Sequence, residues 1–556
     1  MVLNRNGAQL RLRRELIAIV AGLGLCFAVA PAASAAVCPG AVDDADFASK
    51  AQLRKLVKQE NSFGQRFLGS HAHDRTIDWI KDEIRSIDGD FKLRTGPYKI
   101  WSWLPRTKAT DRPGLDLARA GGLSVIGADG TETKLPDAGA VRFSQPTGKT
   151  GRTGELVYLP PDQEITPENS AGKVIIRDYP EAPIPLVGLQ LIGEYLTPDL
   201  ASQTGNYDRP FLGERPQHEE LLDASRAGAA GVIYTFDLPR EQIAGYGDPH
   251  TGTIFKVPAV FVGGDVAAQL KALAAQGGNS ARVVVRAKVE RDKTRNVIAT
   301  LPGKSAEKTA LFANTDGQSW VQEDGVSGLI AFARYYAMLP MRCRPRTLQI
   351  AFTSAHDAVV VDGAARYAQR LDDEYDAGGV AYAFAVEHLG TRELVPQPDP
   401  DGSGQRLAFT GLGEPFLFAA GDSAVLRQTA VDATQRRNLD RTAVLRGLGL
   451  PEQNRVPPIC SMGGLGSFTQ GHLVPTLAVI SGPWSLYAPS FERKAIDFKR
   501  MRSQLLAIGD TVLTLDKIPS EQIAGDYPSY REQRAQGAAT CPPPENLPQF
   551  APGPGE

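Results

Sequence analysis

The sequence predicts an α/β protein with a central, mostly parallel sheet and helices on both of its faces. From residue 295 onward, short apolar runs alternate with amphipathic segments, which is typical of strands joined by helical crossovers. Between about residues 154 and 290, short β-type runs are broken by Gly, Pro and charged residues. This change predicts a β-rich insert.

The central sheet is predicted from four apolar runs, each followed by a loop. Strands are expected at residues 309–313, 347–353, 380–386 and 476–480, and helices at 326–338, 362–371 and 490–508. In sheets of this kind, reactive residues gather at the carboxyl ends of the strands. We therefore look for a functional site in the loops that follow these strands.

The insert and the N-terminal segment have their own predicted elements. In the insert, strands are expected at residues 172–178, 232–234 and 257–262, and helices at 218–227 and 265–275. Residues 43–87 have helical spacing, and Ser70 is a predicted N-cap. His71 and His73 lie in the first turn that follows, where positions two apart diverge around the axis, so we do not expect them to share a metal ion.

The N-terminus has the pattern of a secretory signal peptide. Basic residues precede an apolar run over residues 16–30, and Ala33-Ser34-Ala35 fits a signal-peptidase site. An uncleaved anchor is the alternative, but the apolar run is short for a membrane span. We expect a mature chain that is secreted or retained in the periplasm or cell envelope, with no membrane span after cleavage.

Four cysteines remain after this cleavage: Cys38, Cys343, Cys460 and Cys541. An even number in an exported chain is typical of disulfides, and four cysteines allow three connectivities. We expect Cys38 to pair with Cys541, because both lie in Pro-containing tails that a bridge would join.

Charge and motif content exclude several functions. The formal net charge is −2, so no basic field predicts nucleic-acid binding and no cationic face predicts a membrane surface. The sequence has no Gly-x-Ser-x-Gly elbow and no Gly-rich phosphate loop before a helix. Serine hydrolases and nucleotide-binding proteins are therefore not expected.

Chemically active residues follow three of the predicted strands. The loops contain Asn314-Thr315-Asp316 with Gln322-Glu323-Asp324, then His356-Asp357, then Glu387-His388. One acidic loop is ordinary on a protein surface. Acids and histidines after three separate strands favour a functional site.

The insert resembles a protease-associated domain, a small module found in many exported peptidases and receptors. The resemblance rests on "GKVIIRD", "ASRAGAAGVIY" and "VPAVFVGGDVAAQLKAL", in this order. It implies a lid or an interaction surface without catalytic groups of its own.

Residues 295 to about 518 resemble the zinc-dependent exopeptidase superfamily of aminopeptidases and glutamate carboxypeptidases, which also contains the transferrin receptor and nicastrin. The resemblance begins at "NVIATLPG" and includes the three strand-end loops. It implies the phosphorylase/hydrolase-like α/β fold and a two-zinc site. The expected organisation is a signal peptide at 1–36, a helical and extended segment at 37–150, the protease-associated insert at 151–292, the exopeptidase-like domain at 293–518 and a Pro-rich tail at 519–556.

The superfamily pattern is only partly kept. Asn314 stands where the first histidine ligand is expected, whereas Asp316 keeps the orienting aspartate and Asp324 the bridging one. His356-Asp357 replaces the Glu-Glu pair, and Glu387 matches the next acidic ligand.

The last histidine of the pattern is replaced by the Gly-rich stretch 463–466. His472 lies nearby but too close to the final strand. A two-zinc site needs nitrogen donors that these positions do not supply.

From this pattern we predict metal ligands at Asp324, Asp357 and Glu387 with His356 as general base, and secondary or vestigial roles for Asn314, Asp316, Glu323, His388 and His472. Either one zinc ion, one calcium ion or no metal is expected. The first functional hypothesis is an exported metal-dependent hydrolase of the aminopeptidase type, acting on a peptide or small amide. The alternative is a non-catalytic protein that keeps the peptidase fold and binds a protein partner through its insert.

Overall fold

The structure is a computed structural model that describes residues 38–87, 90–106, 116–136, 138–246, 252–356, 363–400, 402, 404–446, 464–538 and 550–554. The predicted signal peptide, Asp357 and the cysteines Cys460 and Cys541 lie outside these residues. Cys38 and Cys343 are each disulfide-bonded, while the predicted pairing of Cys38 with Cys541 stays a prediction. Within the described residues, every helix is too short or too polar to cross a bilayer.

A nine-stranded sheet forms the centre of the fold, in the order β1-β13-β15-β14-β16-β21-β19-β20-β8. Its middle strands are β15 (Thr347–Thr353), β14 (Lys308–Asn314), β16 (Val380–Val386) and β21 (Thr476–Ile480), and all of them run parallel. Their bounds match the sequence prediction to within a residue, and the predicted fold class is confirmed. The strands are mostly apolar because both faces of the sheet are buried.

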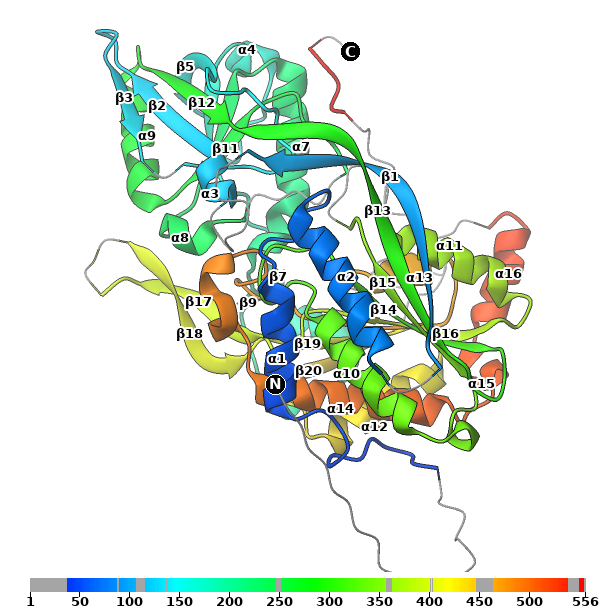
Figure 1. Cartoon of the computed structure of the whole chain (residues 1–556). Coiled ribbons are helices and arrows are strands. Elements are labelled where there is room, and N and C mark those ends of the chain that lie inside the picture. The colour runs from blue at the N-terminus through cyan, green and yellow to red at the C-terminus, as the bar shows by residue number, and fades with distance from the viewer. Residues whose placement is uncertain are drawn as a thin grey trace, which may run out of the picture. The chain divides into compact units, whose positions relative to one another are not determined.

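Helices cover both faces of this sheet (Figure 1). On one face, α11 (Gly363–Tyr375) and α13 (Gly466–Gly471) pack on Phe312 and Ala351. Successive residues of a strand point to opposite faces, so Ala313 faces the other side, where Gly325 of α10 (Gly325–Met338) approaches it. Helix α14 (Phe498–Leu515) packs against α10, with Leu505 beside Gly328.

Helix α14 begins later than the sequence predicts. Residues Pro489–Ala495 form a 3-10 segment in which Glu492 has a non-helical backbone. Asp497 then caps α14 by accepting hydrogen bonds from the backbone N–H groups of Lys499 and Arg500. A capping aspartate is a stronger start signal than apolar spacing alone.

The N-terminal segment adds two helices, α1 (Lys50–Asn61) and α2 (His71–Arg85), which contact α10. Ser70 is the N-cap of α2, as predicted, because its side chain accepts a hydrogen bond from the backbone of His73.

A second, eight-stranded sheet has the order β3-β2-β12-β5-β6-β10-β11-β4. Its strands are β2 (Gly121–Ile126), β3 (Glu132–Leu135), β4 (Gly139–Ala140), β5 (Arg152–Tyr158), β6 (Val174–Asp178), β10 (Gly231–Thr235), β11 (Ala259–Val262) and β12 (Ser280–Val285), with helices α7 (Glu214–Ala227) and α9 (Gly264–Gln276) beside them. This sheet uses residues on both sides of the boundary predicted at 150/151.

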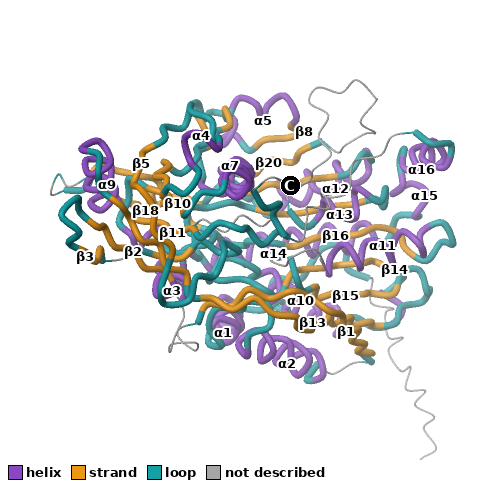
Figure 2. Tube along the Cα trace, turned by 90° about the horizontal axis from the view of Figure 1, so that it is seen from above, coloured by secondary structure: helices purple, strands orange, loops and turns teal. Residues whose placement is uncertain are grey.

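The two sheets are joined by a long antiparallel ribbon. β1 (Lys92–Pro105) pairs with β13 (Ala287–Leu301) along its whole length, and β13 then pairs with β15 (Figure 1). At the other end of the central sheet, β8 (Gly193–Leu196) from the insert pairs antiparallel with β20 (Thr442–Leu445). Seen from above, the central strands follow one another from β1 to β8 (Figure 2).

Further connections complete the fold. The central sheet includes β19 (Phe416–Ala420), followed by α12 (Ala424–Arg436), and β17 (Arg392–Pro398) pairs with β18 (Gln405–Gly413) as a hairpin. The chain continues through α15 (Ser520–Ala524) and α16 (Tyr527–Ala535).

Candidate functional site

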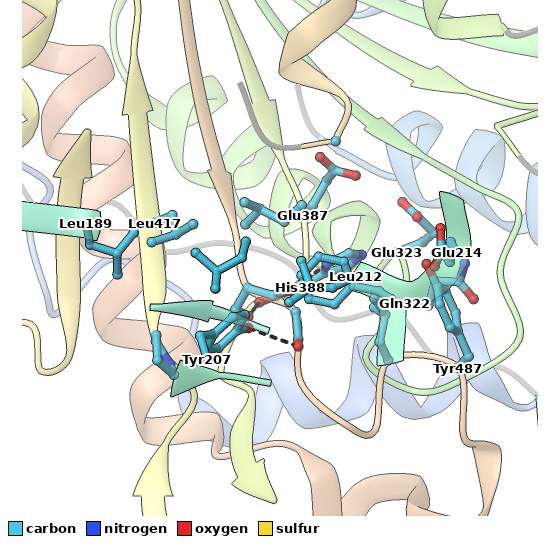
Figure 3. Close-up of a pocket in the computed structure, with 18 of the residues that line it drawn as sticks. Leu189, Tyr207, Leu212, Glu214, Gln322, Glu323, Glu387, His388, Leu417 and Tyr487 are labelled. Atoms are coloured by element: carbon cyan, nitrogen blue, oxygen red, sulfur yellow. Dashed lines mark hydrogen bonds between the residues drawn. The ribbon is translucent and has the colours of Figure 1, made fainter. Parts of the chain in front are cut away.

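The loops after β14, β15 and β16 meet at the carboxyl edge of the central sheet, as the sequence predicts. They line a cavity of about 480 Å³ together with residues of the insert. Figure 3 shows Gln322 and Glu323 on one side of this cavity and Leu189 and Leu417 on the other. One end of the cavity is therefore polar and the rest is apolar.

A compact group of possible metal ligands lies at the polar end. Glu323, Glu387 and His388 are buried, and each offers one ligand atom within 4.8 Å of the others. Three protein ligands that include an imidazole are typical of a catalytic zinc site. Calcium takes six to eight oxygen ligands, so this mixed nitrogen and oxygen set does not support the calcium alternative.

Hydrogen bonds orient two of these ligands. Nδ1 of His388 lies 2.7 Å from the carbonyl oxygen of Ser481. A carbonyl can only accept, so Nδ1 carries the proton and Nε2 is the nitrogen available to a metal. Glu387 Oε2 accepts from the backbone N–H of Leu465 at 2.8 Å. A Cβ at Gly464 would come within 2.6 Å of the same oxygen, so the site requires glycine there.

His356 lies beside this cluster, between two buried acids. Its Nδ1 is 3.3 Å from Asp316 Oδ2 and its Nε2 is 3.3 Å from Glu323 Oε1. Asp316 is fixed by the backbone N–H of Ala355, which donates to its other oxygen at 2.8 Å. Asp316, which the resemblance makes an orienting residue, therefore contacts His356.

Asp324 does not join the cluster. Its Oδ1 accepts from the backbone N–H of Leu389 at 2.7 Å. Burial, together with the charges of Glu60 and Glu323, raises the pKa of Asp324 well above its ordinary value. The hydrogen bond from Leu389 ties Asp324, at the start of α10, to the end of β16.

Two other predicted residues also have structural partners. Asn314 Oδ1 accepts from Thr353 Oγ1 at 2.6 Å, which links the ends of β14 and β15. His472 Nδ1 lies 3.1 Å from Asp372 Oδ2, and His472 does not line the cavity. Asp357 lies outside the described residues.

Backbone conformation explains why Glu323 and His388, and not the predicted Asp324, belong to the group of possible metal ligands. Glu323, Ala355 and His388 have φ values of 73°, 73° and 52°. Non-glycine residues rarely adopt this left-handed region, and such residues gather at functional sites. Glu323 thereby lines the cavity, while the adjacent Asp324 turns to the backbone. No residue-type signal in the sequence distinguishes these two acids.

The N-terminal segment supports the loop that carries Glu323. The backbone N–H of Arg66 donates to Gly317 O at 2.7 Å, and its Nη2 donates to Gln322 O at 2.7 Å. Glu60 accepts from Ser327 Oγ at 2.6 Å and lies 3.9 Å from Arg66. His73, whose pKa is lowered by burial, contacts Thr315 Oγ1 at 2.9 Å, so it supports the first loop.

Comparison with known proteins identifies the fold. No protein-family model matches the sequence, and no curated protein sequence matches it. Solved structures do match. The "Peptidase M28 precursor" of Shewanella amazonensis is 14% identical with a TM-score of 0.56, and 86% of this chain covers 94% of that one.

Two aminopeptidases give the same result. BSAP, a zinc aminopeptidase from Bacillus subtilis, has a TM-score of 0.53 at 14% identity, and 85% of this chain covers 97% of it. The aminopeptidase from Aneurinibacillus sp. strain AM-1 has a TM-score of 0.50 at 14% identity, and the match covers 84% of this chain and 93% of the aminopeptidase. The chain thus has the fold of the zinc exopeptidases, as the resemblance implied. At this identity the likeness defines the fold, and the function must be argued from the site.

Proposed function

We propose that this protein is an exported, single-zinc hydrolase of the aminopeptidase type, acting on a peptide or small amide. The observation that carries the proposal is the buried group of Glu323, Glu387 and His388 at the polar end of a cavity. It lies at the sheet edge where the two-zinc ligands are expected, and it keeps Glu387 of the expected set but adds Glu323 and His388. The change in the ligand set favours one ion instead of two.

The residues around this group suit hydrolysis. A zinc ion, when bound, would polarise the carbonyl group of the substrate and lower the pKa of a bound water. Asp316 holds the ring of His356 at Nδ1, 3.3 Å away, which directs Nε2 toward Glu323. An imidazole in this position can accept a proton and pass it to a leaving amine. Gln322, with Nε2 3.4 Å from His356 Nε2, can orient the bound amide.

The experiment is to measure zinc binding by the purified mature chain. We expect about one zinc per chain after dialysis, by mass spectrometry. We also expect the affinity for zinc to fall at least about a hundredfold in Glu323→Gln and in His388→Gln. Loss of a residue that only orients a ligand already costs about ten- to a hundredfold in metal affinity, and loss of the ligand itself should cost more. His472→Gln is the matched control and should bind normally. Equal zinc binding in all four proteins would contradict this site.

A non-catalytic binding protein is the second candidate function, and a specific observation favours it. Asn314 and Asp324, two positions that the resemblance assigns to metal binding, accept hydrogen bonds from Thr353 and Leu389 and lie outside the proposed ligand group. The insert, proposed as a protease-associated module, would then provide the surface for a protein partner. Aminoacyl-amide hydrolysis that is lost in Glu323→Gln supports the hydrolase. No metal and no hydrolysis would support the binding protein.

A further inference from the structure

The cavity, most of which is apolar, is larger than one amino-acid side chain requires. With its polar end included, its volume of about 480 Å³ is roughly three times that of the ~150 Å³ apolar cavity that accepts benzene in a small model protein. It falls within the range of pockets that enclose whole small ligands. The insert provides much of the wall, including Leu186, Leu189 and Phe211, and the central sheet provides Leu417 and Ile480.

The wall offers few polar groups to a ligand. Apart from Tyr487, which lies with Gln322 and Glu323 at the polar end (Figure 3), its polar side chains are Tyr207 and Ser481. Tyr207 Oη donates to Gly482 O at 3.0 Å (Figure 3), and Ser481 Oγ bonds both Thr391 Oγ1 and His388 O. A peptide backbone buried against this wall would leave N–H and C=O groups without side-chain partners, which costs free energy. A hydrocarbon chain has no such groups.

A segment beside the cavity is apolar both inside and outside it. This segment, from β7 (Ile184–Pro185) through α5 (Val187–Ile192), lines the cavity with Ile184 and Leu189. Ile184 is 45% exposed, and Val187 and Leu191, which do not line the cavity, are 57% and 74% exposed. Adjacent exposed apolar residues beside an apolar pocket indicate a site where an apolar group is bound.

The polar end of the cavity limits which polar head group a ligand with a hydrocarbon chain can carry. Glu214, Glu323 and Glu387 bring three carboxyl groups to the cavity, which disfavours an anionic head such as a fatty acid carboxylate. An amide has both a donor and an acceptor, so it can meet the carboxyl and imidazole groups there.

We propose that the cavity binds the hydrocarbon chain of an N-acyl amide, with the amide at Glu387 and His388. As a substrate class, this rests on the proposed hydrolase function. Binding of the hydrocarbon chain depends only on the apolar wall of the cavity and not on the hydrolase function. The acyl carbonyl would be the group attacked, water would add to it, and a fatty acid and an amine would leave.

The test is calorimetric binding of N-acetyl-, N-hexanoyl- and N-decanoyl-alaninamide to the full mature chain, with and without EDTA. We expect the dissociation constant to fall by about fourfold for each added methylene until the cavity is full. Decanoate should bind more weakly than the decanoyl amide. Equal affinity for the acetyl and decanoyl ligands would overturn the proposal.

Two variants separate the cavity from general surface adsorption. Leu189→Asn places an amide in the wall and should abolish the dependence on chain length. Leu412→Asn changes an equally apolar residue, 51% exposed on β18, and should leave it intact. Equal losses in both variants would contradict the proposed pocket.

The same ligands distinguish this proposal from the hydrolase proposal. Chain-length-dependent binding without release of alaninamide would uphold the pocket and reject the hydrolase. Release that is equally fast from the acetyl and decanoyl ligands would uphold the hydrolase and reject the acyl pocket.

Discussion

Two clusters of the molecule pair a histidine with carboxyl groups, and they differ in what surrounds them. In the cavity, His356 lies between Asp316 and Glu323, beside Glu387 and His388. On the surface of α11, His472 and Asp372 lie beside Arg531 and Arg534, whose guanidinium groups contact the Asp372 carboxylate at 2.7 and 3.0 Å.

This difference distinguishes the cluster that we propose as the functional site from one that joins two helices. Arg531 and Arg534 balance Asp372 and fasten α16 to α11. No lysine or arginine is among the described residues that line the cavity. The cavity cluster instead brings two carboxyl groups and an imidazole within 4.8 Å of one another, which is the set of side chains that we propose for a metal ion.

The largest expected effect concerns Arg66, the buried arginine that holds the cavity loop without touching its acids. Arg66→Met would remove the Nη2 hydrogen bond to Gln322 O and the counter-charge of Glu60, whereas the backbone hydrogen bond to Gly317 O would remain. We expect a loss of about 3 to 5 kcal/mol in unfolding free energy, measured in urea at pH 7. A loss below about 1 kcal/mol would show that the loop is held by other contacts.

The next effect is a pH dependence from Glu60. Burial raises its pKa from 4.5 to about 7. Between these values the folded state keeps a proton that the unfolded state has lost, so stability falls as pH rises from 4.5 to 7 and is then constant. The loss is on the order of 3 kcal/mol. Glu60→Gln should remove this slope, as seen by urea unfolding at pH 5 and pH 8. If the unfolding free energies of the wild type and of Glu60→Gln changed equally between pH 5 and pH 8, the raised pKa of Glu60 would be rejected.

A smaller effect of opposite sign is expected from Asp372. Burial would raise its pKa, but hydrogen bonds from His472, Arg534 and Arg531 outweigh burial and hold the pKa well below its ordinary value. Its contribution is therefore present above about pH 4 and is lost as pH falls further. Asp372→Asn should cost about 1 to 2 kcal/mol at pH 6 and progressively less toward pH 2. A cost that does not change with pH would argue against the ion pairs.

The smallest effect is expected from His472→Gln. Its contact with Asp372 is partly exposed, so we expect less than about 1 kcal/mol of destabilisation by thermal unfolding. A destabilisation of several kcal/mol would mean that His472 supports α16 as strongly as the two arginines do.

The central strands could be predicted from sequence because each is a short, mostly apolar run between turn residues. Such runs are stable only where both faces of a strand are buried, as in the centre of a parallel sheet. β8 could not, because its pairing with β20 joins residues about 250 positions apart and its own composition is unremarkable. The long β1–β13 ribbon was missed for a related reason. Charged residues such as Glu290, Arg291 and Asp292 interrupt the apolar pattern of β13 where it lies outside the main sheet.

For the site, sequence reasoning predicted the three loops but not which side chain of each loop faces the cavity. Glu387 does so as expected, whereas Glu323 and His388 were given secondary roles. Their left-handed backbones turn them inward, and non-glycine residues carry no sequence signal for that conformation. Residue type therefore predicted the region, whereas the backbone dihedrals decide which side chains of the loops reach the cavity.

The pairing of β8 with β20 has a consequence for any attempt to remove the insert. Thr442–Leu445 carries buried side chains and receives its outer hydrogen bonds from the insert. Deleting residues 151–292 would turn this strand into a bare sheet edge, which is a template for aggregation. By pairing with β20, β8 of the insert covers this edge of the central sheet and so prevents edge-to-edge association. Designs that transplant the peptidase-like part alone would need a charged residue or a proline on that strand.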